Sequence, residues 1–151
     1  MTQLAALLSK TEVFGKLANQ EIENLSRLAY KRHIKKGENI YYQEDLWPYV
    51  IYIASGELRS LINSPDGRSY IISPWLVGEA FWAHTVFDGL PMPSTLEAVR
   101  SSTLYQWHGD DALQIVLGNL DATKDLLRRQ VSLIRRRREN IYGLVFNPVV
   151  S

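Results

Sequence analysis

Apolar and polar residues alternate in short runs through the middle of the chain, which is the pattern of β-strands with one buried face. Turn residues separate the runs, as in Lys36-Gly37-Glu38 and Ser64-Pro65-Asp66-Gly67. Two short amphipathic helices are expected first, at 2–8 and at 20–28, the second with Asn19 as its N-cap. Strands are then expected at 29–34, 39–42, 50–54, 57–62, 68–72, 95–100 and 103–107. Short strands at such close spacing predict an all-β sandwich or barrel.

The period of the pattern becomes helical after residue 107. A short helix is expected over 110–117, and a long one over about 121–144 with Asp121 as its N-cap. Four apolar residues on the long helix recur every seven positions: Leu120, Leu127, Ile134 and Ile141. A helix of about 24 residues extends for roughly 36 Å, which is long for a small domain. We therefore expect Leu127, Ile134 and Ile141 to form a seam with a second copy in a homodimer.

Composition narrows the class of protein. The 151 residues, 46% of them hydrophobic, suit one folded domain with an appendage. The absence of Cys excludes a disulfide scaffold, a Cys-ligated metal site and a thiol nucleophile. No apolar run approaches the roughly 18 residues of a membrane span, and no signal-peptide pattern precedes the first helix. We expect a soluble, cytoplasmic protein without a membrane partner.

The net charge of +1 conceals an asymmetry. Residues 1–120 carry 10 basic and 13 acidic side chains (−3), whereas residues 121–151 carry 7 and 3 (+4). Much of the basic excess lies in the run Arg135-Arg136-Arg137-Arg138. Such a run can contact nucleic acid, but no aromatic residues interleave it and the rest of the chain is acidic. We therefore interpret it as the solvated face of a long helix.

Motifs for catalysis are missing from the sequence. His33, His84 and His108 are scattered singly, without the His-x-His pair that metal-binding jelly rolls use. No Gly-x-Ser-x-Gly elbow and no phosphate-binding Gly-rich loop occurs. We therefore expect no enzyme, no catalytic residues and no metal site.

A set of short motifs carries a resemblance to a known family through its order and spacing. The motifs are Lys36-Gly37-Glu38-Asn39-Ile40, Gln43-Glu44-Asp45, Val50-Ile51-Tyr52-Ile53-Ala54-Ser55-Gly56-Glu57-Leu58, Asp66-Gly67-Arg68, Gly78-Glu79-Ala80 and Ser94-Thr95-Leu96-Glu97-Ala98. Together they resemble the cyclic-nucleotide-binding-like sensor domain of the Crp/Fnr superfamily of bacterial transcription regulators. One departure is Glu44, where the family usually has Gly.

The resemblance implies a mainly β fold with flanking helices, namely a double-stranded β-helix (jelly roll) followed by a long C-terminal dimerisation helix. It places the β-roll sensor domain with its N-terminal helices at 1–119 and the dimerisation helix at 120–146. Residues 147–151 would be a hinge towards a helix-turn-helix domain that is absent from this sequence. DNA would be bound only through that domain, and an effector would act by changing the geometry of the homodimer.

The same resemblance bears on the identity of the effector. In cyclic-nucleotide binders of this family, the Glu of a Gly-Glu pair holds the ribose and a later Arg holds the cyclic phosphate. Gly78 and Glu79 match the pair, but Met92 stands at the Arg position and Pro93 has no N–H for the phosphate. A buried phosphate without these partners is costly, so we expect an unknown small-molecule effector rather than cAMP.

The predicted effector-binding residues come from the matching positions: Gly78, Glu79, Met92, Ser94, Thr95, Arg137 and Arg138. The apolar segments 82–87 and 91–93 favour an organic ligand, to which Arg137 and Arg138 could supply a counter-charge. Two alternatives stay open, a haem-based sensor with His84 as axial ligand and a ligand-free structural module that only dimerises. No particular cofactor is predicted.

Overall fold

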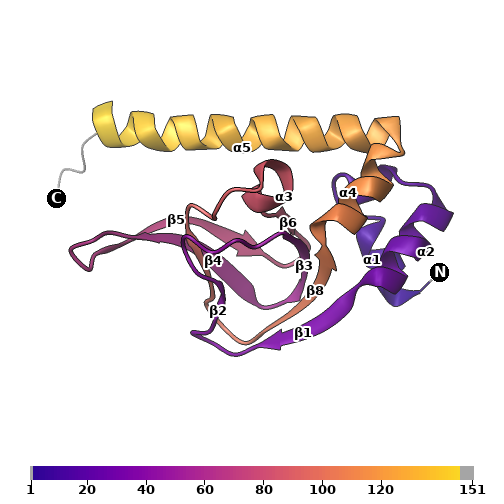
Figure 1. The fold of residues 1–151 in the computed structure, drawn as a ribbon, viewed down its shortest axis with the longest axis horizontal. Coiled ribbons are helices and arrows are strands. Elements are labelled where there is room, and N and C mark those ends of the chain that lie inside the picture. Colours follow the sequence, from indigo (N-terminus) through magenta and orange to yellow (C-terminus); the bar gives the residue numbers. More distant parts are fainter. Residues whose placement is uncertain (1, 147–151) are drawn as a thin grey trace.

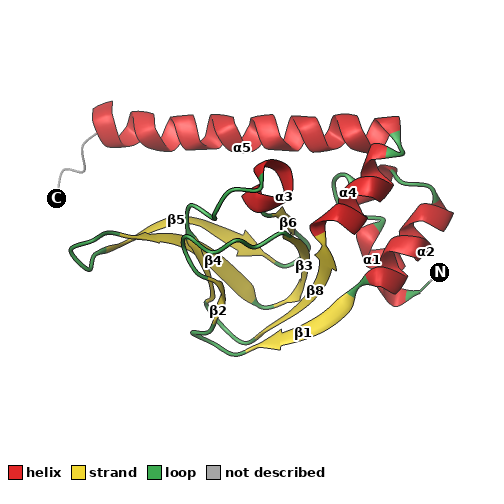
Figure 2. Ribbon diagram, viewed as in Figure 1, coloured by secondary structure: helices red, strands yellow, loops and turns green. Residues whose placement is uncertain are grey.

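The computed structural model describes residues 2–146, with side chains as far as residue 143, so the predicted hinge at 147–151 lies outside the described residues. Two antiparallel sheets face each other, and helices cover one end and one side of them (Figures 1 and 2). The strands are β1 (Tyr30–Ile34), β2 (Asn39–Tyr41), β3 (Tyr49–Ser55), β4 (Glu57–Asn63), β5 (Ser69–Leu76), β6 (Ala80–Trp82), β7 (Thr95–Ala98) and β8 (Ser102–His108). The helices are α1 (Gln3–Leu8), the 3-10 turn η1 (Phe14–Lys16), α2 (Asn19–Leu28), α3 (His84–Asp88), α4 (Gly109–Leu117) and α5 (Leu120–Phe146).

The strand order is β1-β8-β3-β6 in the first sheet and β2-β7-β4-β5 in the second. Apart from the β4–β5 hairpin, consecutive strands therefore alternate between the two sheets, as in a jelly roll, and the predicted mainly β fold with a long C-terminal helix is confirmed. β5 lies at an edge and pairs only with β4, which is why it can contain Pro74 without breaking a ladder on both sides.

The core has two parts that share strand β3. Ile51 and Ile53 point between the two sheets, whereas Val50 and Tyr52 point outward under the helices. Because both faces of β3 are buried, the strand reads as a nearly continuous apolar run. The helical part of the core is centred on Trp107, whose indole N–H donates to the Leu25 carbonyl at 2.7 Å.

Helix α5 runs along one side of the sandwich and passes over α3 (Figure 1). Its first turns are anchored, since Ala122 and Leu126 are buried in the helical part of the core. Further along, Leu133 packs against the inter-sheet core while its neighbours are mostly exposed. The helix therefore has a docked N-terminal part and a C-terminal part that lies over the sandwich with an open outer face.

Four local predictions need correction. Ala18, not Asn19, is the N-cap of α2, and its N–H donates to the Glu21 carboxylate at 2.8 Å. The N-terminus of α5 is capped by Asn119 rather than Asp121, because the Asn119 side-chain oxygen accepts the Ala122 N–H at 3.0 Å.

The other two corrections concern segment 80–88. A three-residue strand, β6, was not predicted, because it is too short to show an alternating pattern. The segment after it, expected to belong to a loop, contains the helix α3, which ends at Gly89 with a left-handed φ of 70°.

Candidate functional site

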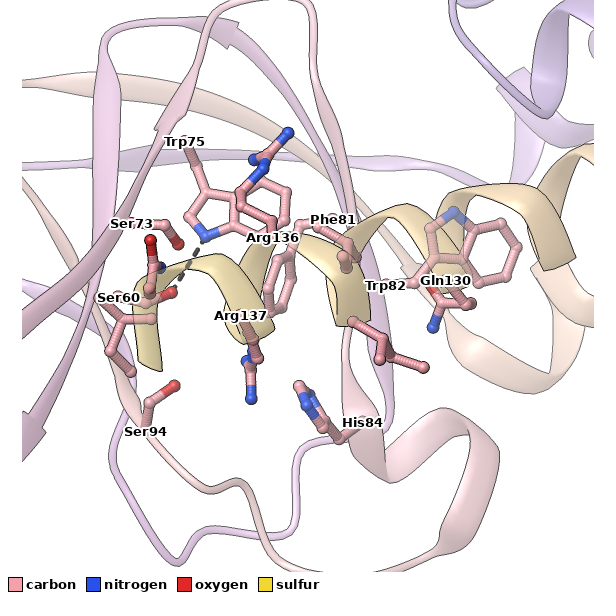
Figure 3. A pocket seen from close by; sticks show the side chains of 14 residues that line it. Ser60, Ser73, Trp75, Phe81, Trp82, His84, Ser94, Gln130, Arg136 and Arg137 are labelled. Carbon is pink, nitrogen blue, oxygen red and sulfur yellow. Dashed lines mark hydrogen bonds between the residues drawn. The ribbon is translucent and has the colours of Figure 1, made fainter. Parts of the chain in front are cut away.

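A cavity of about 240 Å³ lies between the sandwich and α5. It is lined by Ser60, Ile72, Ser73, Trp75, Phe81, Trp82, His84, Ser94, Gln130, Leu133, Ile134, Arg136, Arg137 and Asn140. Strands β4, β5 and β6 line the cavity on the sandwich side, and α5 lines it on the opposite side (Figure 3). Because both bodies contribute side chains, any occupant would contact the sandwich and the helix at once.

The sandwich side of the cavity is aromatic. Trp75 and Phe81 meet edge to face with 4.8 Å between ring centroids. The Trp75 indole N–H donates to the Ser60 hydroxyl at 3.0 Å, which fixes the ring (Figure 3). Trp82 extends the wall, and all three rings are buried. The wall is therefore rigid and apolar.

Arg129 holds α5 against this wall. Its guanidinium donates to the Ala80 carbonyl on β6 and lies 5.8 Å from the centroid of the Trp75 ring. The same group lies 3.4 Å from the Glu12 carboxylate. The Arg129 side chain is only 13% exposed, so its contacts with Ala80 and Trp75 form within the interface between helix and sandwich, whereas Glu12 lies at the exposed edge of that interface.

The opposite end of the cavity is polar. Arg137 from α5, His84 from α3 and Ser94 from the start of β7 approach the same space in Figure 3. Burial lowers the pKa of His84, and the neighbouring Arg137 lowers it further, so the imidazole is neutral at pH 7.

Tyr41, on β2, lies next to Ser94 but is not one of the lining residues. Its ring is almost fully buried, and its hydroxyl forms no hydrogen bond of standard geometry. Burial raises its pKa well above the ordinary value, while the adjacent Ser94 hydroxyl and the Arg137 guanidinium act in the opposite direction. The hydroxyl is therefore neutral and available as a donor close to Ser94.

The cavity brings together two of the seven predicted effector residues, Ser94 and Arg137. Gly78 lies in the β5–β6 turn with φ of 87°, and Glu79 in the same turn accepts the Leu76 N–H at 2.8 Å. Met92 is fully buried between the sheets. Its N–H donates to the Asp45 carbonyl at 2.8 Å, so neither Met92 nor Pro93 offers a free amide.

The remaining two predicted residues face elsewhere. Thr95 accepts the Gln43 N–H at 2.9 Å and lines a separate groove on the second sheet. Arg138 lies on another face of α5, beside Arg135 and Tyr142.

Sequence reasoning did not select several lining residues, including Trp75, Gln130 and Arg136. The expected strand ended at residue 72, so Trp75 fell outside it. Arg136 belongs to the basic run, and only the rotation of the helix distinguishes it from its neighbours.

The predicted dimer seam is exposed on α5. Leu127, Ile134 and Ile141 are 62–67% exposed, although each is a large apolar side chain. Ile134 also borders the cavity. Apolar side chains at seven-residue spacing on an open helix face are the pattern of a helix–helix interface.

The haem alternative would rest on one imidazole among the lining residues, that of His84. Among residues 2–146 no cluster of three or more His, Asp or Glu side chains is arranged to hold a metal ion. Within the same range no helix is both long and apolar enough to cross a membrane.

An eight-stranded antiparallel sandwich with a long C-terminal helix is the architecture of cyclic nucleotide-binding domains. Residues 31–119 match the profile of the cyclic nucleotide-binding domain, and the chain belongs to that family. The match covers most of the sandwich, so the resemblance found in the sequence is confirmed.

Solved structures show the same fold. The catabolite activator protein of Thermus thermophilus is 22% identical, with a TM-score of 0.76 over 89% of this chain and 63% of that chain. The sensor domain of the transcriptional regulator DNR from Pseudomonas aeruginosa is 18% identical, with a TM-score of 0.76 over 97% and 93%. FixK2 from Bradyrhizobium japonicum is 20% identical, with a TM-score of 0.69 over 78% and 58%.

A curated relative, a lysophospholipase from Neosartorya fischeri, is 25% identical over 122 residues. The matched region is 74% of this chain but 8% of the lysophospholipase. The chain thus spans a small part of that protein and somewhat under two thirds of the Thermus regulator.

Proposed function

We propose that this chain is the effector-sensing and dimerisation domain of a Crp/Fnr-type transcription regulator. The observation that carries the proposal is the cavity lined jointly by the sandwich and α5. A ligand there would favour one position of α5 over another, because it contacts both bodies. By linkage, it would shift the geometry of any dimer built on that helix.

The proposed effector is not a cyclic nucleotide. The carboxylate that would hold a ribose, that of Glu79, bonds to the Leu76 N–H outside the cavity. The position expected to hold the cyclic phosphate is occupied by Met92, whose side chain lies in the core. Neither a sugar nor a cyclic phosphate would find its usual partners here.

Binding, rather than catalysis, is the role that the site supports. The lining residues provide cations, hydroxyls, amides, aromatic rings and one imidazole, that of His84, with no lining carboxylate to orient it for catalysis. A purely structural module is the competing role, and the volume and polar end of the cavity favour a ligand over a filled core.

Native mass spectrometry with and without added cAMP tests the proposal. We expect a dimer, with no cAMP adduct at micromolar nucleotide. A monomer at the same protein concentration would contradict the dimerisation role. A dimer that takes up one cAMP per chain would contradict the assignment of a different effector.

A further inference from the structure

The shape of the cavity favours a flat ring. On the sandwich side, Trp75 and Phe81 present a buried aromatic surface fixed by their edge-to-face contact. On the helix side, Leu133 and Ile134 close the space. A planar ring between such walls replaces water with apolar contact on both faces.

The charge of the cavity favours an anion. Its fourteen lining residues include two guanidiniums, those of Arg136 and Arg137, and no Asp or Glu. His84 adds no fixed charge, because burial and the field of Arg137 lower its pKa more than the nearby Asp88 carboxylate raises it. Two cations without a lining carboxylate leave a positive potential that an anionic ligand would neutralise.

The donors at the polar end favour a carboxylate. Arg137 and Ser94 line this end, whereas the buried Tyr41 hydroxyl lies next to Ser94 outside the lining. A carboxylate is an acceptor with two coplanar oxygens, which matches the guanidinium fork and leaves lone pairs for the Ser94 hydroxyl.

A phosphate ester is a poorer match for the same donors. Protein phosphate sites commonly use several backbone N–H groups in a loop or at a helix N-terminus. Here the Met92 N–H is already bonded to the Asp45 carbonyl at 2.8 Å, and Pro93 has none. The polar end therefore offers side-chain donors suited to a planar acid.

We propose that the effector is a compact aromatic monocarboxylate. Its carboxylate binds Arg137 and Ser94, and its ring lies against Trp75 and Phe81. The inference rests on the proposed sensing role and specifies the chemical class that the same cavity selects.

Isothermal titration of the whole chain with 3-phenylpropionate and with its neutral isostere 3-phenylpropionamide tests this. We expect the acid to bind about tenfold or more tightly than the amide, because only the acid forms a charge-assisted pair with Arg137. Arg137→Gln should abolish this preference. Arg135→Gln is the matched control, since Arg135 lies on the same helix but does not line the cavity.

Ser94→Ala provides a second variant that leaves the charge unchanged. It should weaken binding of the acid more than binding of the amide, because a hydroxyl donates a stronger hydrogen bond to a charged carboxylate than to a neutral amide carbonyl. Thermal unfolding of each variant confirms that it is folded.

Three results would overturn the inference: equal binding of acid and amide, an unchanged preference in Arg137→Gln, or binding of neither probe by the folded chain. In each of these cases a cAMP-free dimer in the mass spectrum would still support the proposed function. Uptake of cAMP, or a monomeric chain, would instead count against the proposed function itself.

Discussion

At the scale of single residues, Glu44 shows how a departure from a family pattern acquires a physical meaning. The residue adopts a φ of 75°, in the left-handed region that favours glycine. The turn is held in this shape, because the Glu44 N–H donates to the Met92 carbonyl at 2.8 Å and the Asp45 carboxylate accepts the Tyr42 N–H at 2.9 Å. The backbone of Glu44 is therefore strained, because its Cβ is crowded in the left-handed region.

Glu44→Gly is expected to raise the free energy of unfolding by about 0.5–1 kcal/mol, because relief of strain outweighs the added entropy of the unfolded chain. Chemical denaturation measures the change. Glu44→Ala is the matched control, since it removes the carboxylate but keeps the Cβ and should give no comparable gain. Equal stabilisation by both variants would assign the effect to the side chain instead of the backbone.

The direction of single side chains explains why the family motifs predicted some site residues and not others. Ser94 and Thr95 are neighbours on an extended segment, so their side chains point to opposite faces, and only Ser94 lines the cavity. Arg137 and Arg138 are separated by about 100° around the helix, and only Arg137 lines it. A motif locates a segment, whereas the register of the strand and the rotation of the helix select the side chain.

At the scale of elements, the spacing of hydrophobic residues predicted the longer strands, whether one or both of their faces are buried, and it predicted the long helix. It could not predict β6, because three buried residues define no period. It ended β5 too early, since Pro74 is normally disfavoured in a strand and only the edge position makes it acceptable. The cavity itself joins the consecutive strands β4, β5 and β6 to α5, which lies far along the sequence from them, so no local pattern could predict its lining.

The contact that joins these elements is testable at Arg129. Arg129→Met keeps the length of the side chain but removes the guanidinium that donates to the Ala80 carbonyl and lies beside Trp75. We expect faster hydrogen exchange along α5, corresponding to a loss of about 1–2 kcal/mol in the free energy of local opening, with little change in β3 and β8.

Arg128→Met is the control for this experiment. The Arg128 side chain is 71% exposed and pairs with Asp125 of its own helix at 3.4 Å, so its loss should leave exchange in α5 unchanged. If Arg129→Met and Arg128→Met change hydrogen exchange in α5 to the same extent, Arg129 does not anchor the helix.

At the scale of the whole molecule, α5 has two faces with different roles. One face docks on the sandwich and roofs the cavity. The other exposes Leu127, Ile134 and Ile141 at 62–67% of their surface. Burying this stripe against a second copy would remove apolar surface from water at both helices, and it would couple the cavity to the partner through a single element.

Ile134→Arg tests whether that stripe is the dimer interface. An arginine at the centre of an apolar seam would bring like charges together at the two-fold axis, so we expect sedimentation velocity to show a monomer where the unaltered chain is a dimer.

Since Ile134 also borders the cavity, Leu127→Arg is a companion variant that alters the seam outside the cavity lining. Ser132→Arg adds the same charge to an exposed position about 160° away from Ile134 around the helix and should leave the dimer intact. If both seam variants stay dimeric, the association uses another surface, and a ligand in the cavity would have no route through α5 to the partner. If both become monomers while Ser132→Arg does not, the helix that roofs the cavity is also the helix that holds the dimer, as an effector-controlled regulator requires.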